Sequence, residues 1–131
     1  MKIKYNYNGI DVNAELKNKL NIFFDISASG KTFFFRILQL YCKENGLRYA
    51  SFDYKSENTE EAMIAYSKNT KVVILDNADL YLTQNLLDSL LSCADYVLIS
   101  IKDLTKINIR NSSFLRVRYT SDKLEVYAAD E

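Results

Sequence analysis

Two short segments at the start of the chain, residues 3–7 and 10–14, alternate between apolar and polar side chains. Such alternation is typical of a β-strand with one buried face. Between them lies Asn8-Gly9, and both residues tolerate the positive φ angles that a tight hairpin turn requires. The pattern therefore predicts an N-terminal β-hairpin.

The next part of the chain alternates between apolar runs of strand length and longer apolar segments of helix length. Residues 20–24 form a nearly continuous apolar run, which favours a strand buried on both faces. Residues 33–45 are apolar on almost every side and are followed by Gly46, which predicts a helix packed into the body of the domain and ended by a left-handed glycine. Further strands are predicted at residues 48–54, 71–76 and 96–100, and further helices from near Asn58 and after the capping residue Thr83.

This order of elements predicts a single α/β domain over residues 1–131. Strands that alternate with helices form right-handed βαβ units, and hence a mostly parallel sheet. We expect a three-layer fold with a mostly parallel five-stranded sheet, to which the N-terminal hairpin and a C-terminal β-hairpin over residues 114–127 are added. Ligands of such sheets bind at the carboxyl ends of the strands. Polar residues stand at those ends in this sequence, namely Asp25, Asp53, Asp76 and Ser100.

The segment that carries the most chemical information is residues 25–32, which read Asp-Ile-Ser-Ala-Ser-Gly-Lys-Thr. Its last three residues match the end of the phosphate-binding loop, Gly-x-x-x-x-Gly-Lys-Ser/Thr. Gly30 would let backbone N–H groups approach phosphate oxygens, and Lys31 would meet the β- and γ-phosphates. Thr32 would offer its hydroxyl to Mg²⁺. The helix that follows would direct the positive end of its dipole at the same anion.

The surroundings of this motif strengthen the interpretation. An apolar strand precedes it, an apolar helix follows it, and a later buried strand, Val72-Val73-Ile74-Leu75-Asp76, resembles a Walker B segment whose aspartate holds magnesium through water. In this order of elements the chain resembles a reduced P-loop NTPase of the AAA/ABC-like ATPase branch. The resemblance covers about residues 1–120, and the opening hairpin is similar to the start of ABC-type and RecF-type ATPase domains.

The resemblance implies a definite sheet order and a definite set of ligands. The order would be 5-1-4-3-2, with the strand that ends at Ser100 between the strands that end at Asp25 and Asp76. ATP, or another nucleoside triphosphate, would be bound together with Mg²⁺. The implied nucleotide contacts are Ser27, Ala28, Ser29, Gly30, Lys31 and Thr32. The implied metal contacts are Thr32 and Asp76.

The departures from this family pattern bear on activity. Asp25 and Ala28 stand where ABC-type loops usually have glycine, and Asp25 adds a negative charge next to a site for an anion. Asn77 follows Asp76 where ATPases of this branch normally have glutamate. An amide can position a water molecule but cannot accept its proton, so the general base is expected to be lost. The resemblance therefore implies at most a slow ATPase, with no catalytic residue assigned.

The composition limits the kinds of catalysis and the kinds of partner that are expected. The chain has no histidine, which excludes Cys–His catalysis, and Cys42 and Cys93 lie in apolar helical patterns as expected for buried free thiols. The formal net charge is zero, so nothing draws the whole protein towards nucleic acid or a membrane. The first residues lack the apolar core of a signal peptide and no run approaches 18 apolar residues, so we expect a cytoplasmic protein without membrane contact.

One segment is locally basic. Between Lys102 and Lys123 there are six basic residues and two acidic ones. The basic residues are Lys102, Lys106, Arg110, Arg116, Arg118 and Lys123. A solvated surface is the favoured interpretation, and a contact with nucleic acid is the less favoured one.

Two functional hypotheses from different classes follow. The first is a minimal, degenerate P-loop protein that binds an ATP-like nucleotide with Mg²⁺ weakly, hydrolyses it little or not at all, and acts through a protein partner. The second is a pseudo-ATPase adaptor or inhibitor, of the kind carried by phages or mobile elements, that keeps the fold but no longer binds nucleotide. A small P-loop kinase is the least favoured, because no lid segment with arginines is found.

Overall fold

The computed structural model describes residues 1–24, 30–55 and 58–129. Its strands are β1 (Lys2–Tyr7), β2 (Ile10–Glu15), β3 (Leu20–Phe23), β4 (Tyr49–Phe52), β5 (Thr70–Leu75), β6 (Ala94–Ser100), β7 (Ser112–Tyr119) and β8 (Lys123–Ala128). Its helices are α1 (Lys31–Glu44), α2 (Glu60–Ser67) and α3 (Gln84–Cys93), with two short 3₁₀ turns, η1 (Ala78–Leu80) and η2 (Leu104–Lys106).

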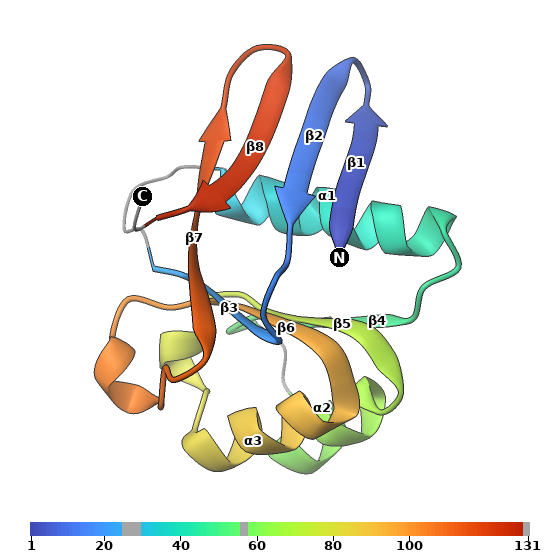
Figure 1. The fold of residues 1–131 in the computed structure, drawn as a ribbon. Coiled ribbons are helices and arrows are strands. Elements are labelled where there is room, and N and C mark those ends of the chain that lie inside the picture. Colours follow the sequence, from blue (N-terminus) through green and yellow to red (C-terminus); the bar gives the residue numbers. More distant parts are fainter. Residues whose placement is uncertain (25–29, 56–57, 130–131) are drawn as a thin grey trace.

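The strands of the described residues form one sheet in the order β1-β2-β8-β7-β3-β6-β5-β4 (Figure 1). Neighbouring strands are parallel from β7 to β4, and β6 lies between β3 and β5. The pairs β1–β2 and β7–β8 are antiparallel hairpins. A short parallel pairing of residues 11–13 with residues 123–125 joins the two hairpins.

The predicted fold class is wrong, because the sheet is not a mostly parallel five-stranded one with hairpins added. It is a mixed eight-stranded sheet that curls into a half-barrel, and the parallel section with the order 5-1-4-3-2 is only one part of it. Strand β7 makes the connection, since Ser112 pairs with β3 and Leu115 pairs with β8. Asp11 of β2 pairs with Lys123 of β8, and this parallel pairing joins the two hairpins although the residues lie near opposite ends of the chain. Alternation within a segment predicts a strand but does not indicate which distant strand will pair with it.

Helix α1 lies in the hollow of the curled sheet (Figure 1). One buried cluster joins its apolar residues to the parallel strands and to both hairpins. The helix contributes Phe34, Phe35, Ile37, Leu38 and Cys42. The parallel strands contribute Phe23, Val72, Ile74 and Leu98, and the hairpins contribute Ile3, Val12, Ala14, Leu115, Val117 and Leu124. The prediction that this helix packs into the body of the domain is confirmed.

Helices α2 and α3 cover the opposite face of the parallel strands (Figure 1). Alternate residues of the strands point to this side, so that Ile22, Val73 and Ile99 pack against Leu86, Leu87 and Leu90 of α3. Side chains bury both faces of β3, which has no exposed residue. The continuous apolar runs in the sequence thus correspond to strands enclosed from two sides.

Several local predictions are confirmed. Asn8 and Gly9 have φ angles of 49° and 87°, as a tight turn between β1 and β2 requires. The hydroxyl of Thr83 accepts a hydrogen bond of 3.1 Å from the backbone N–H of Leu86 at the start of α3. Cys42 is a buried free thiol, and burial raises its pKa to about 11. Cys93 is also free but only half-buried, so that part of the prediction was wrong.

The hairpins are expected to stabilise the fold through their contact with α1. Leu124 of β8 is 0% exposed within the cluster around α1. Leu124→Ala would leave a cavity that the surrounding sheet and helix can fill only partly. We therefore expect it to lower the free energy of unfolding by about 2–5 kcal/mol. Urea unfolding followed by circular dichroism measures this change. The neighbouring exposed residue supplies the control, since Lys123→Ala should change stability by no more than about 0.5 kcal/mol. Equal effects of the two substitutions would contradict the assigned core.

Candidate functional site

The carboxyl ends of β3, β6 and β5 lie along one edge of the sheet, because these strands are parallel neighbours. Helix α1 begins at this edge, and Gly30 directly before it has a φ angle of 89°. Other residues are strained in that left-handed conformation. The turn into α1 therefore requires glycine at the position where the phosphate-loop motif has one.

The structure brings Thr32 and Asp76 together at this edge. The Thr32 hydroxyl lies in the first turn of α1 and donates a hydrogen bond of 3.2 Å to Oδ2 of Asp76, directly after β5. These are the two residues that the sequence assigned to the metal, and they lie 44 positions apart in the chain. A hydroxyl and a carboxylate are hard oxygen ligands of the kind that Mg²⁺ prefers.

Hydrogen bonds hold Asp76 through its backbone N–H, its carbonyl and both carboxylate oxygens. Its backbone N–H donates to the carbonyl of Phe52 at the end of β4, at 2.9 Å. Its Oδ1 accepts from the backbone N–H of Asn77 at 3.0 Å, and its carbonyl accepts from the hydroxyl of Tyr81 at 2.7 Å. Together with the bond from Thr32, these contacts fix both the backbone and the carboxylate. A carboxylate held in this way is preorganised for a cation.

Asn77 has a structural reason to be asparagine. Its φ angle is 51°, in the left-handed region, and asparagine is among the few residues other than glycine that occupy it readily. The left-handed backbone of Asn77 turns the chain from β5 into η1, and its N–H donates to the carboxylate of Asp76. A glutamate at this position would be strained, so Asn77→Glu is not a simple way to restore a general base.

The remaining predicted nucleotide contacts are only partly described. Lys31 is the first residue of α1 and is half-buried. Ser27, Ala28 and Ser29 lie outside the described residues, as does Asp25. The part of the motif that the structure describes is thus Gly30, Lys31 and Thr32.

The other acidic residues near this edge have structural contacts. The carboxylate of Asp79 accepts hydrogen bonds from the backbone N–H groups of Lys102 and Asp103, at 2.8–3.1 Å, and so fixes the segment after β6. Asp53 accepts from the N–H of Lys55 at 2.8 Å. The described residues contain no group of three or more His, Cys, Asp or Glu side chains that could hold a metal. A cation at Thr32 and Asp76 would therefore need further oxygens from a ligand such as a phosphate.

An aromatic cluster adjoins the start of α1. The ring of Phe33 stacks on that of Tyr119 with centroids 5.2 Å apart, and Tyr7 meets Phe33 edge-on at 5.9 Å. A Cβ at Gly30 would lie 3.7 Å from Cβ of Tyr119. The apolar pattern of residues 33–45 predicts that Phe33 belongs to a packed helix but gives no link to the hairpins, because Tyr7 and Tyr119 reach it only through the curl of the sheet.

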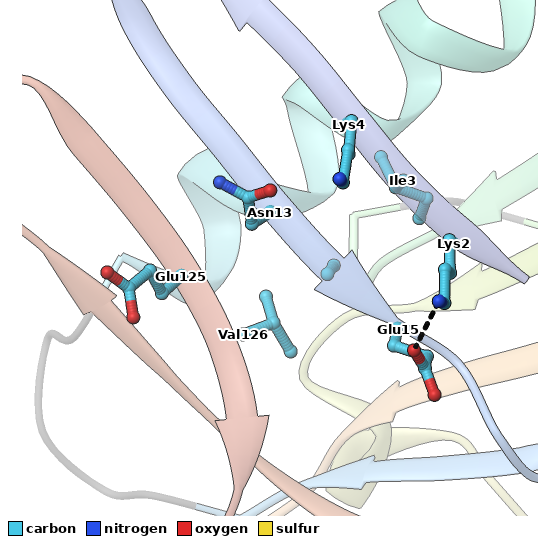
Figure 2. Close-up of a pocket in the computed structure, with 8 residues that line it drawn as sticks. Lys2, Ile3, Lys4, Asn13, Glu15, Glu125 and Val126 are labelled. Atoms are coloured by element: carbon cyan, nitrogen blue, oxygen red, sulfur yellow. Dashed lines mark ion pairs between the residues drawn. The ribbon is translucent and has the colours of Figure 1, made fainter.

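An open pocket of about 410 Å³ lies elsewhere, on the outer face of β1, β2 and β8 (Figure 2). Figure 2 shows Lys2 and Glu15 turned towards each other across it, as an ion pair of 3.9 Å. Lys4, Asn13 and Glu125 complete its polar lining. Among the predicted nucleotide and metal contacts that the structure describes, namely Gly30, Lys31, Thr32 and Asp76, none lines this pocket.

Two of the six basic residues between Lys102 and Lys123 have neighbours that the structure describes. Arg118 lies opposite Glu125 in the β7–β8 hairpin and over the ring of Tyr127, at 4.7 Å. The ammonium group of Lys106 donates to the backbone carbonyl of Asp79, which holds it against η1. These neighbours favour the interpretation as a solvated surface.

Comparison with known proteins adds no relative: no protein-family model, curated protein or solved structure matches the chain. Within the part of the chain that the structure describes, none of the helices combines the length and the apolar character needed to cross a bilayer.

Tyr81 makes the stability of the folded protein depend on pH above pH 10. Burial, followed by the negative charges of Asp76 and Asp53, raises the pKa of its phenol above the ordinary value of 10.0. The folded protein therefore favours the protonated phenol, and this stability is present below pH 10 and is lost as the pH rises further. We expect Tyr81→Phe to flatten the decline of the unfolding free energy above pH 10 by up to about 1.4 kcal/mol per pH unit.

Urea unfolding between pH 8 and pH 11 measures this decline. Tyr66→Phe, an exposed tyrosine on α2, is the control and should keep the slope of the unaltered protein. Identical slopes for Tyr81→Phe and Tyr66→Phe would contradict the environment assigned to Tyr81.

Proposed function

We propose that this protein binds a nucleoside triphosphate, such as ATP, together with Mg²⁺, weakly and with little or no hydrolysis. The observation that carries the proposal is the hydrogen bond between Thr32 and Asp76. Two residues far apart in the chain supply a hydroxyl and a carboxylate beside the first turn of a helix, next to a lysine. This combination supports a site where a cation and an anion are bound together.

Each described residue has a separate task in this proposal. Gly30 permits the turn that exposes backbone N–H groups, and Lys31 supplies positive charge for the terminal phosphates. Thr32 and Asp76 hold the cation, directly or through water, and phosphate oxygens complete its coordination. The N-terminus of α1 adds the partial positive charge of its dipole.

Weak binding and slow turnover follow from two residues. Asp25 brings a negative charge into the segment that would surround the phosphates. Asn77 cannot accept a proton from an attacking water, and its left-handed backbone disfavours a glutamate. A protein of this kind would act in the cytoplasm by binding a partner rather than by turnover. The adaptor that no longer binds nucleotide is the alternative.

Removal of the lysine tests the proposal. With ATP and Mg²⁺ at a hundred times the dissociation constant, the protein should be stabilised by about 2.7 kcal/mol, which raises the melting temperature by several degrees. We expect Lys31→Ala to abolish this shift, because the terminal phosphates would lose their positive partner. Differential scanning fluorimetry measures it, and Lys43→Ala at the other end of α1 is the matched control. A melting temperature that millimolar ATP and GTP leave unchanged would favour the adaptor.

A second substitution is expected to strengthen binding. Asp25→Gly removes a negative charge and restores the glycine of the motif, so we expect tighter binding by about tenfold, or about 1.4 kcal/mol. Isothermal titration calorimetry with ATP and Mg²⁺ measures the change. Equal or weaker binding would show that Asp25 does not repel the ligand.

A further inference from the structure

Tyr81 connects the apolar core to the carboxyl edge of the sheet. Its ring packs against the buried cluster between the sheet and helices α2 and α3, and this packing restrains the side chain. Its hydroxyl lies 2.7 Å from the carbonyl oxygen of Asp76 and 3.2 Å from that of Phe52. The residue thus bridges the ends of two neighbouring strands, β4 and β5.

The two bonds of Tyr81 differ in their consequences. A hydroxyl has one hydrogen to donate, and the shorter distance assigns it mainly to Asp76. The carbonyl of Phe52 is already satisfied by the backbone N–H of Asp76. The carbonyl of Asp76, by contrast, lies where the chain leaves β5 and turns into η1 through the left-handed Asn77. The Asp76–Asn77 peptide also carries the N–H that donates to Oδ1 of Asp76. The bond from Tyr81 therefore restrains the same peptide that holds the Asp76 carboxylate.

We infer that Tyr81 is a positioning residue for Asp76 and holds its carboxylate against the hydroxyl of Thr32. The inference rests on the proposed function only for its consequence in cation binding. Without the hydroxyl, the end of β5 keeps its bond to β4 but loses the restraint on the Asp76 carbonyl. The carboxylate then samples directions in which it no longer meets Thr32.

The first test requires no ligand. Thr32→Val removes the hydroxyl that donates to Asp76, and urea unfolding measures the fall in midpoint that results, both in the unaltered protein and in Tyr81→Phe. If Tyr81 positions Asp76, the fall in midpoint should shrink by at least half in the Tyr81→Phe background, because the bond is already weakened there. Tyr66→Phe, on the exposed surface of α2, should leave the effect of Thr32→Val unchanged. An equal effect of Thr32→Val in all three backgrounds would overturn the inference.

The second test separates the contribution of the cation to binding from the contribution of the nucleotide. Calorimetric titration with ATP is carried out once with Mg²⁺ and once with EDTA. We expect Tyr81→Phe to weaken binding of ATP with Mg²⁺ by about tenfold, as is usual when a group that orients a metal ligand is removed. Binding of ATP in EDTA should change by less than about twofold, since Lys31 and the start of α1 are untouched. A substitution that only destabilises the fold would leave the ratio of the two affinities unchanged.

The outcomes distinguish this inference from the proposed function. If the unaltered protein binds ATP in neither condition, the proposed function fails, and the ligand-free coupling between Thr32 and Tyr81 alone decides the positioning role. If nucleotide binds and Tyr81→Phe weakens both conditions equally, the proposed function stands and the positioning role is overturned. Loss confined to the Mg²⁺ condition, together with the reduced coupling, supports both.

Discussion

The enclosure of α1 by the curled sheet is the packing constraint from which the candidate site follows. Phe34 and Leu38 are buried against the parallel strands and the hairpins together, so the helix can neither rotate nor slide without opening this cluster. Close-packed protein interiors resist such displacement. The first turn of α1 is thereby fixed beside the end of β5, and Thr32 is held next to Asp76.

At the carboxyl edge of the sheet, the hydrogen-bonded pair of Thr32 and Asp76 is followed by a backbone position unsuited to glutamate. Asp76 is restrained through its N–H, its carbonyl and both carboxylate oxygens. Asn77 directly follows and has a left-handed backbone, with a φ angle of 51°. The residue next to the restrained carboxylate therefore stands in a backbone conformation that disfavours glutamate.

Sequence reasoning passed over two tyrosines at this site. Tyr81 lies five residues after Asp76, in a segment whose only local signal is a short turn, and its hydrogen bonds depend on the approach of β4. Tyr119 reaches the start of α1 because β7 belongs to both the parallel section and a hairpin. A tyrosine next to a predicted strand end could have drawn attention, but the sequence contains ten tyrosines and does not distinguish these two.

The sequence by itself determined the local elements and the candidates for the site. The positive φ angles at Asn8-Gly9, the cap at Thr83, the buried strands and the apolar helix that became α1 all depend on residues close together in the chain, so periodicity and turn chemistry suffice to predict them. The contact of Thr32 with Asp76, the pairing of Asp11 with Lys123 and the curl of eight strands around α1 depend on residues far apart. Such contacts are chosen by the packing of the whole chain, because only the folded sheet decides which strand edges and side chains meet. For that reason the five-stranded parallel sheet expected from the sequence was replaced by a larger mixed sheet.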